Sequence, residues 1–319
     1  MKPPGEQLPA GPPPDGQARP GPTPDDARRV EEALHFDLGV VEWGGGPAPP
    51  VVLVHGFGAS AHSWRHWTGP LGRRGPVLTV DLTGFGEAPC PPGARLAPED
   101  HAARLTGWLR SRPGPAPILV GHSLGAPVVL MTALRLEEHA TAGRGASGVA
   151  GVAVVSGAVF RQPFPPYMGA ARIPLVGDLL MAIPPPRRIL AMGIRGIVAD
   201  GATVTPELVE GYRRPLTSWR RRRAILRAAR AIRPSTAGIL SSRYDTIRAP
   251  VLALWGSEDP VVPPDFARRL VAAVPRGESV LLEGVGHLVP EEAPRASAEA
   301  FMAWMERSVS GGGPPEPAP

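Results

Sequence analysis

Cysteine and lysine are almost absent from this chain of 319 residues. Cys90 is the only cysteine and Lys2 the only lysine, so arginine supplies 33 of the 34 basic residues. A single cysteine excludes a disulfide framework and a cysteine-rich metal site. Aromatic residues make up 5% of the chain, too few to alternate with basic residues as nucleic-acid-binding surfaces require. We therefore expect no nucleic-acid partner, despite the formal charge of +5.

Long apolar runs are also missing. No stretch reaches the roughly 18 consecutive apolar residues that a membrane-spanning helix needs. The first 24 residues contain nine prolines and no apolar segment of the kind found in signal peptides. We therefore predict disordered tails at 1–25 and 310–319, a cytoplasmic location and no integral membrane association.

Short apolar runs rich in β-branched residues alternate with helix-like segments between the tails. Continuous apolar runs of this length are typical of strands buried on both faces, and their alternation with helices predicts a mostly parallel, doubly wound α/β sheet. The segment Leu34–Trp43 is a candidate hairpin at the edge of that sheet. The six predicted strands are Val51–Val54, Val77–Val80, Ile118–Val120, Val149–Val155, Val251–Trp255 and Ser279–Leu282.

The alternation stops between Val159 and Pro234, where prolines separate short helical segments. One helix is expected to begin at Pro206, with Thr205 as its N-cap. The sequence thus predicts a helical cap at 159–234, inserted between core segments 26–158 and 235–309. Most apolar cap residues are expected to pack the cap onto the core, with a few lining a substrate pocket. These residues are Met168, Ile173, Leu175, Val176, Leu179, Leu180, Met181, Ile183, Ile189, Leu190, Met192 and Ile194.

Four consecutive arginines, Arg220 to Arg223, form the one cluster of positive charge. We interpret them as the solvated side of a cap helix whose Ile225, Leu226 and Ile232 face inward. Attraction to an anionic substrate or a membrane surface is the alternative interpretation.

The segment Gly121-His-Ser-Leu-Gly125 follows a predicted strand and opens a predicted helix. A strand-to-helix turn of this kind strains the serine backbone and exposes its Oγ beside the positive end of the helix. The pattern G-x-S-x-G in this context favours Ser123 as a nucleophile over a structural turn serine.

A serine hydroxyl needs a base to take its proton and an acid to orient that base. His287 lies in a loop after the last predicted strand, at the sheet edge where α/β active sites gather. His122 is expected to pack or hydrogen-bond locally. Glu258 and Asp259, which follow another strand, are the candidate acids. The histidines expected in surface or capping roles are His35, His62, His66, His101 and His139.

An oxyanion formed by attack on a carbonyl would need backbone N–H donors. The N–H of Leu124, directly after the nucleophile, is one candidate. The glycine-containing loop that begins at His55 supplies the other, and we assign that role to the N–H of Phe57.

Five motifs occur in order: HGFG, DLTGFGEAP, GHSLGA, GSEDPVVP and GVGHLVPEE. Together they resemble the α/β-hydrolase superfamily, over about residues 35–308 apart from the cap. The resemblance implies the α/β-hydrolase fold and a catalytic triad of Ser123, Asp259 and His287 in that chain order, with Asp259 preferred to Glu258. It implies neither a metal nor an organic cofactor, and a structural role for the Asp81 turn.

These inferences predict a serine hydrolase that cleaves a carboxylic ester with an apolar acyl or alcohol group through an acyl-serine intermediate. Its partner would be a small-molecule ester, whose identity stays open. The same triad could cleave thioesters or lactones, or carry out perhydrolysis. A remote alternative is dinucleotide binding, because Gly56-x-Gly58-x-x-Ala61 follows a strand and Asp81 ends the next one.

Overall fold

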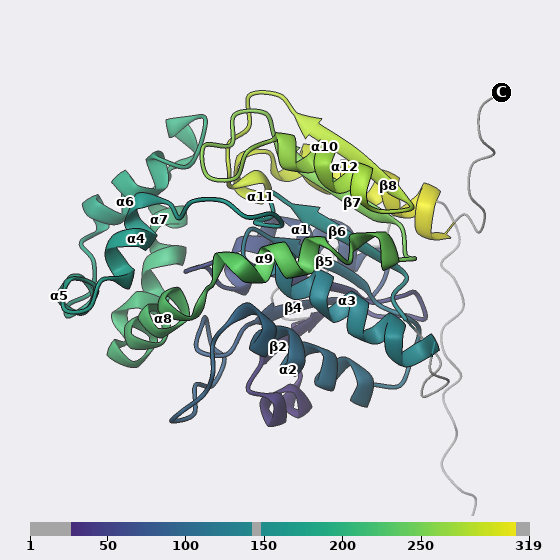
Figure 1. Ribbon diagram of the computed structural model, residues 1–319, viewed down its shortest axis with the longest axis horizontal. Coiled ribbons are helices and arrows are strands. Elements are labelled where there is room, and N and C mark those ends of the chain that lie inside the picture. The colour runs from purple at the N-terminus through teal and green to yellow at the C-terminus, as the bar shows by residue number, and fades with distance from the viewer. Residues whose placement is uncertain (1–26, 142–147, 311–319) are drawn as a thin grey trace, which may run out of the picture.

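The structure, a computed structural model, describes residues 27–141 and 148–310 (Figure 1). The predicted tail at 1–25 lies outside these ranges, as does the tail at 310–319 except for its first residue. Eight strands form one sheet in the order β1-β2-β4-β3-β5-β6-β7-β8. Their bounds are β1 Arg28–Arg29, β2 Gly39–Trp43, β3 Val51–Val54, β4 Val77–Asp81, β5 Ile118–His122, β6 Gly151–Val155, β7 Val251–Gly256 and β8 Gly277–Leu282.

From β4 to β8 in this order, every neighbouring pair of strands is parallel. The two antiparallel pairs are β1 with β2 and β2 with β4, so β2 alone runs opposite to the other strands. The predicted mostly parallel α/β sheet is therefore confirmed. The helices on its two faces, outside the predicted cap, are α1 Arg65–Gly72, α2 Pro98–Ser111, α3 Gly125–Thr141, α10 Asp265–Ala273, α11 Val289–Glu292 and α12 Pro294–Trp304.

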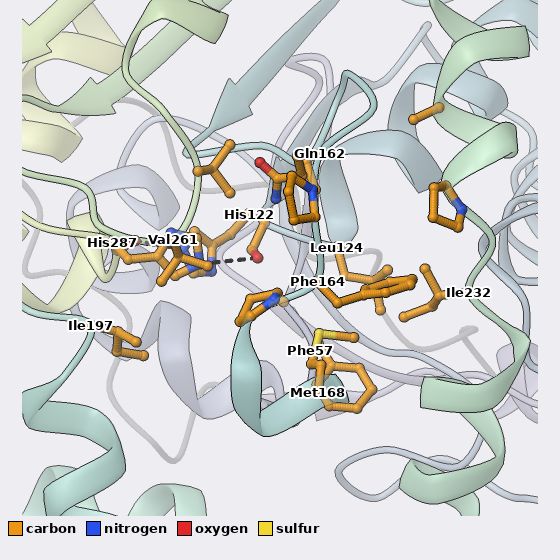
Figure 2. Close-up of a pocket in the computed structure, with 18 of the residues that line it drawn as sticks. Phe57, His122, Leu124, Gln162, Phe164, Met168, Ile197, Ile232, Val261 and His287 are labelled. Carbon is orange, nitrogen blue, oxygen red and sulfur yellow. Dashed lines mark hydrogen bonds between the residues drawn. The ribbon is translucent and has the colours of Figure 1, made fainter. Parts of the chain in front are cut away.

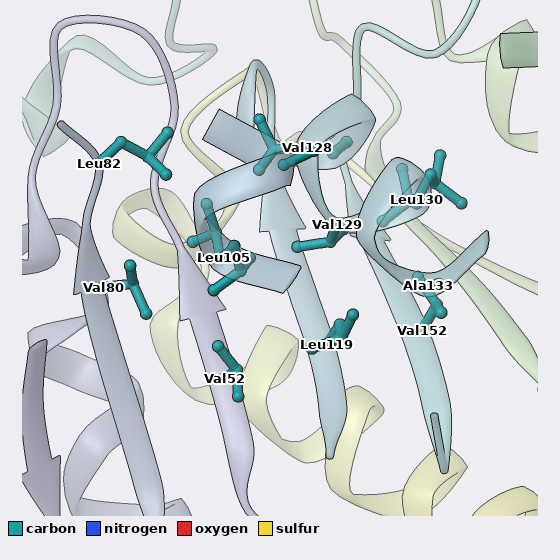
Figure 3. Packing of buried hydrophobic residues seen from close by; sticks show 14 of the residues in the cluster. Val52, Val80, Leu82, Leu105, Leu119, Val128, Val129, Leu130, Ala133 and Val152 are labelled. Atoms are coloured by element: carbon teal, nitrogen blue, oxygen red, sulfur yellow. The ribbon is translucent and has the colours of Figure 1, made fainter. Parts of the chain in front are cut away.

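Alternating side chains of the central strands form two hydrophobic cores. Val52 and Val54 of β3 point to one face, where they join the buried side chains of α2, α3 and α10 (Figure 3). Val51 and Leu53 point to the other face, where Trp67 of α1 packs in the same cluster as side chains of α12. Because both faces are covered, β3 is apolar at every position and its neighbours are apolar at most positions. Burial on both faces therefore explains the continuous apolar runs in the sequence.

The predicted hairpin at Leu34–Trp43 is only partly correct. Glu31–Phe36 forms a 3-10 turn, which ends at Asp37 with φ of 55°. The strand that follows, β2, pairs with β4, so it lies inside the sheet, and the edge position falls to β1. A hairpin does exist, but it joins Arg28–Arg29 to β2 through this turn.

Helices occupy the chain between β6 and β7, and they gather at one end of the molecule in Figure 1, apart from α9, which runs back beside α3. The described part of 159–234 contains no strand. Thr205 is the N-cap of α7, as predicted, because its side chain accepts the Leu208 N–H. The bounds are α4 Pro166–Arg172, α5 Val176–Leu180, α6 Arg187–Arg195, α7 Pro206–Arg213, α8 Trp219–Ala231 and α9 Pro234–Ser241.

Two expectations about this region are only partly correct. Arg220 and Arg223 are exposed, as expected. Arg222, in contrast, is buried, because it lies on the side of α8 that faces the protein. Its guanidinium donates hydrogen bonds to four backbone carbonyls, among them those of Met181 and Ala182. Ile225 and Leu226 are buried as predicted. Most of the apolar residues assigned to cap packing are instead exposed, since α5 and α6 are apolar on their outward sides too. The exposed ones are Ile173, Leu175, Val176, Leu179, Leu180, Ile183, Ile189 and Met192.

No helix in the described ranges has both the length and the apolar character needed to cross a membrane.

Candidate active site

Ser123 lies in a tight turn between β5 and α3. Its φ of 51° is in the left-handed region, which non-glycine residues seldom adopt. Both flanking glycines are needed for close packing. A Cβ at Gly121 would lie 2.4 Å from the Gly125 carbonyl oxygen, and one at Gly125 would lie 2.4 Å from the carbonyl oxygen of Val54. The turn therefore depends on glycine at both positions, as the sequence pattern predicts.

The structure brings the three predicted triad residues together at the carboxyl edge of the sheet. The hydroxyl of Ser123 lies 3.0 Å from Nε2 of His287 (Figure 2). The Nδ1 of the same ring lies 2.9 Å from one carboxylate oxygen of Asp259 and 3.1 Å from the other. With Nδ1–H donating to Asp259, Nε2 is left with a lone pair for the serine proton. Glu258, the competing acid, is exposed.

Asp259 is held in its ionised form. Burial alone would raise the pKa of this carboxyl, but the hydrogen bond and charge of His287 and the N–H groups of Val262 and Val261 outweigh it. The net result is a pKa below the ordinary value for aspartate. Asp259 therefore offers His287 a carboxylate that remains negative in neutral solution.

The two N–H groups predicted to bind an oxyanion are free. Within the described ranges, neither the Phe57 N–H nor the Leu124 N–H donates to another backbone group. Both residues line the cavity that contains Ser123. The loop bearing Phe57 comes so close that a Cβ at Gly56 would lie 3.1 Å from the Cβ of Ser123.

His55 fixes the orientation of that loop. Its Nε2 accepts the Leu82 N–H at 3.1 Å, so Nδ1 carries the hydrogen and donates to the Gly56 carbonyl at 2.8 Å. Because the peptide is planar and trans, a fixed Gly56 carbonyl directs the next N–H, that of Phe57, to the opposite side. The sequence placed His55 in the loop without assigning it this role.

The cavity above Ser123 has a volume of about 140 Å³ and is lined mainly by apolar side chains (Figure 2). This is comparable with cavities of about 150 Å³ that hold a benzene ring. Of the twelve apolar residues between Met168 and Ile194 that were expected to pack the cap or line a pocket, Met168 alone is among its lining residues. The apolar side chains that line the cavity are Phe57, Leu124, Phe160, Phe164, Met168, Ile197, Ile232, Val261, Val262 and Leu288.

His122 is buried and packs against Trp64, which is one of the two roles expected for it, but its hydrogen bond reaches a residue far away in the chain. Its Nε2–H donates to the backbone carbonyl of His287 at 2.9 Å, and the two rings lie 5.0 Å apart. Burial is the main reason that the pKa of His122 falls to about 3, with the nearby His287 ring lowering it further. A neutral His122 thus holds the loop that carries His287.

Glu292 also holds this loop, and sequence reasoning missed it. Its carboxylate accepts the N–H groups of Gly286 and Leu288, on either side of His287, at 2.9 Å each. It also accepts the N–H of Ala199, between α6 and α7, at 2.7 Å. The sequence feature that could have indicated Glu292 is its place as the second glutamate of GVGHLVPEE, five residues after the candidate base.

Asp81 stabilises the backbone of two neighbouring loops. One of its oxygens accepts the N–H of Ala61 at 2.6 Å, and the other accepts the N–H of Glu87 at 2.7 Å. A dinucleotide-binding acid would need these oxygens for a ribose, so the structural role inferred for the Asp81 turn fits these contacts. Among the described residues, no cluster of three or more histidine, cysteine, aspartate or glutamate side chains could hold a metal ion.

Comparison with known proteins gives a family model that covers most of the chain. The model of the alpha/beta hydrolase family matches residues 51–300. An uncharacterised hydrolase of Bacillus subtilis, YugF, is 27% identical over 249 residues, which is 78% of this chain and 87% of that protein. The pimeloyl-[acyl-carrier protein] methyl ester esterase of Neisseria meningitidis is 29% identical, covering 82% of this chain and 93% of its own. A thermophilic esterase from Thermogutta terrifontis has a similar fold, with a TM-score of 0.67 at 23% identity over 85% of this chain and 94% of that one.

Proposed function

The chain belongs to the alpha/beta hydrolase family, and on that premise we propose that it is a serine hydrolase that cleaves a carboxylic ester through an acyl-serine intermediate. The observation that carries the proposal is the hydrogen-bonded series from Ser123 through His287 to Asp259 beneath two free backbone N–H groups. Esterase activity among the relatives, including the methyl ester esterase of Neisseria meningitidis, supports the choice of an ester.

In the first half of the reaction, the Ser123 hydroxyl gives its proton to Nε2 of His287 and its oxygen attacks the ester carbonyl. Asp259 accepts the Nδ1–H of the imidazolium and stabilises its charge. The carbonyl oxygen becomes an oxyanion, which accepts hydrogen bonds from the N–H groups of Phe57 and Leu124. The alcohol leaves with the proton from His287, and the acyl group remains on Ser123.

In the second half, His287 takes a proton from water, and the resulting hydroxide attacks the acyl-serine carbonyl. The tetrahedral intermediate collapses, the acid leaves, and the proton on His287 returns to Ser123. The apolar cavity accommodates an apolar acyl or alcohol group about as large as a benzene ring. We propose that the cap segment, 159–234, sets this preference through Phe160, Phe164 and Met168.

The test is hydrolysis of nitrophenyl esters from acetyl to palmitoyl by the wild type and by Ser123→Ala. We expect the wild type to prefer short acyl chains and the variant to lose at least about 10⁴-fold in kcat. Ser156→Ala is the matched control, because Ser156 directly follows a strand, β6, as Ser123 follows β5, and also has a positive φ. This variant should leave kcat unchanged.

An inert wild type, or a Ser123→Ala variant with undiminished activity, would refute ester hydrolysis at this site. Activity on acyl thioesters or lactones in place of esters, still lost in Ser123→Ala, would keep the acyl-serine mechanism and change the substrate class. Perhydrolysis, with peroxide in place of water in the second half, is distinguished in the same way.

A further inference from the structure

Exposed apolar side chains gather at one end of the molecule. Nine of the eleven large hydrophobic residues that are most exposed in the described ranges belong to residues 173–192 or to Trp219, the first residue of α8. We call this set the apolar tip; α5, at its centre, projects from the molecule in Figure 1. Its members are Ile173, Leu175, Val176, Leu179, Leu180, Ile183, Ile189, Met192 and Trp219.

The apolar tip is not simply the outside of an ordinary surface helix. In α6, Ile194 is buried and Leu190 packs against the core, yet Ile189 and Met192, on the outward side, are also apolar. A surface helix that faces only water usually carries polar residues on its outward side. Contiguous exposed apolar surface of this kind marks an interaction site in soluble proteins.

Leu175 is the clearest case of an apolar side chain of the tip that the backbone holds in solvent. It lies in a γ-turn with φ of 65°, closed by the Val176 N–H donating to the Pro174 carbonyl at 2.8 Å. Turns of this hand are rare and strained. The side chain held by this turn is 81% exposed, so the strain places a leucine in solvent rather than in a core.

Positive charge surrounds the apolar tip. Residues 173–230 contain eleven arginines and four carboxylates, a net charge of +7, whereas the whole chain carries +5, so the rest of it carries −2. In α6, Arg188, Met192 and Arg195 lie on one face of the helix, at spacings of four and three residues. Both arginines are exposed, and neither has a carboxylate partner in the part of the chain that the structure describes.

The arginines of α8 lie beside the same surface. Buried Arg222 donates to the carbonyls of Met181 and Ala182, which joins α8 to the loop after α5. The exposed Arg220 guanidinium lies 5.7 Å from the ring centroid of Trp219. The pKa of the Asp178 carboxyl in α5 is lowered, chiefly by the hydrogen bond that Arg230 donates to it and in smaller part by the charge of Arg223. Arg223 itself is exposed. The apolar tip is thus flanked by arginines on two helices.

We propose that the apolar tip docks on an anionic lipid bilayer. The apolar side chains would enter the boundary between headgroups and acyl chains, while the arginines would bind lipid phosphates. A second copy of the chain would bring two +7 surfaces together, and their repulsion disfavours it. An acidic protein could pair with the arginines, but α5 projects outward and offers it no groove; a bilayer accepts a projecting apolar tip. The tip begins five residues after Met168, so docking would bring the cavity close to lipid.

The test is flotation of the full-length Ser123→Ala variant with vesicles of phosphatidylcholine alone or of equal parts phosphatidylcholine and phosphatidylglycerol. This variant leaves the lipids uncleaved, so the result does not depend on the proposed esterase activity. We expect it to float with the mixed vesicles, and much less with phosphatidylcholine alone. Adding Arg220→Gln and Arg223→Gln should weaken partitioning roughly 10- to 30-fold. Adding Leu179→Ser and Ile183→Ser should weaken it about tenfold or more.

Matched controls remove the same groups elsewhere on the surface. Arg73→Gln with Arg110→Gln removes two exposed charges of the core, and Ile239→Ser with Leu281→Ser removes two exposed apolar side chains. Both controls should float like their parent. Absence of flotation with mixed vesicles, or equal weakening by the controls, would overturn the proposal. A different result would also overturn it: the protein does not float, sedimentation shows a monomer–dimer equilibrium, and only the tip variants abolish the dimer.

Discussion

Glu258 and Asp259 are adjacent in the chain, but only Asp259 reaches His287. The backbone turns after β7, where the Asp259 carboxylate accepts the N–H groups of Val261 and Val262. These bonds direct the carboxylate into the protein and toward the ring, while Glu258 stays exposed. A one-residue difference in position thus separates a buried, oriented carboxylate from a solvated one.

Replacing Asp259 with asparagine tests whether this carboxylate orients the base. Asp259→Asn keeps the shape but removes the charge that stabilises the imidazolium, and it favours the wrong tautomer of His287. We expect kcat for the best ester to fall by about 10⁴-fold with a much smaller change in KM. Glu258→Gln is the control and should retain wild-type kinetics. A Glu258→Gln variant that loses more activity than Asp259→Asn would reassign the acid.

At the level of secondary structure elements, one carboxylate links the His287 loop to the segment between α6 and α7. Glu292 lies at the end of α11 and accepts N–H groups from the His287 loop and from Ala199, just beyond α6. The His287 N–H in turn donates to the carbonyl of Ile197 at 2.9 Å. The position of the proposed base therefore depends on the segment that follows α6.

Glu292→Gln should loosen this link without unfolding the chain. An amide oxygen can accept only part of the three bonds and carries no charge, so the His287 ring should sample unproductive positions. We expect kcat to fall by roughly 10- to 100-fold, the range seen when supporting hydrogen bonds around a reactive site are removed. The thermal midpoint should change by only a few degrees.

Glu299→Gln is the matched control, because Glu299 is an exposed glutamate of α12 whose one ion pair among the described residues is with Arg295. A structural role alone would predict lower stability with unchanged kcat in Glu292→Gln, and that result would contradict positioning.

The elements differ in how well the sequence predicts them. Strands such as β3 and β5 can be predicted from the sequence because burial on both faces leaves a continuous apolar run. The turn at Ser123 can be predicted because it permits few residues other than glycine on either side of the serine. The outward orientation of Leu175 and Leu179 is not readable, since an apolar residue is by default expected inside. The hydrogen bond from Ala199 to Glu292 cannot be predicted from the sequence either, because it joins residues 93 positions apart in the chain.

Across the whole molecule, buried histidines with a lowered pKa oppose stability in acid, His101 and His122 among them. His101 was expected in a surface or capping role, but it is fully buried beside Phe85. Burial is the main reason that the pKa of His101 falls from 6.5 to about 3. The pKa of His122 is lowered to about 3 as well. Both side chains are neutral in the folded protein at pH values where they are protonated in the unfolded chain.

Proton binding to His101 makes the free energy of unfolding depend on pH. Because the folded pKa of His101 lies below the unfolded value, the unfolded state binds more protons, and the stability present above pH 6.5 is lost as the pH falls toward 3. At about pH 5 the loss from one such histidine is about 2 kcal/mol. His101→Leu cannot be protonated, so its free energy of unfolding should fall about 2 kcal/mol less than that of the wild type between about pH 8 and pH 5. Urea titrations at the two pH values measure this difference, and the comparison at the higher pH isolates any packing change caused by leucine. Equal losses in the two proteins would mean that His101 is protonated in the folded state or is not buried there.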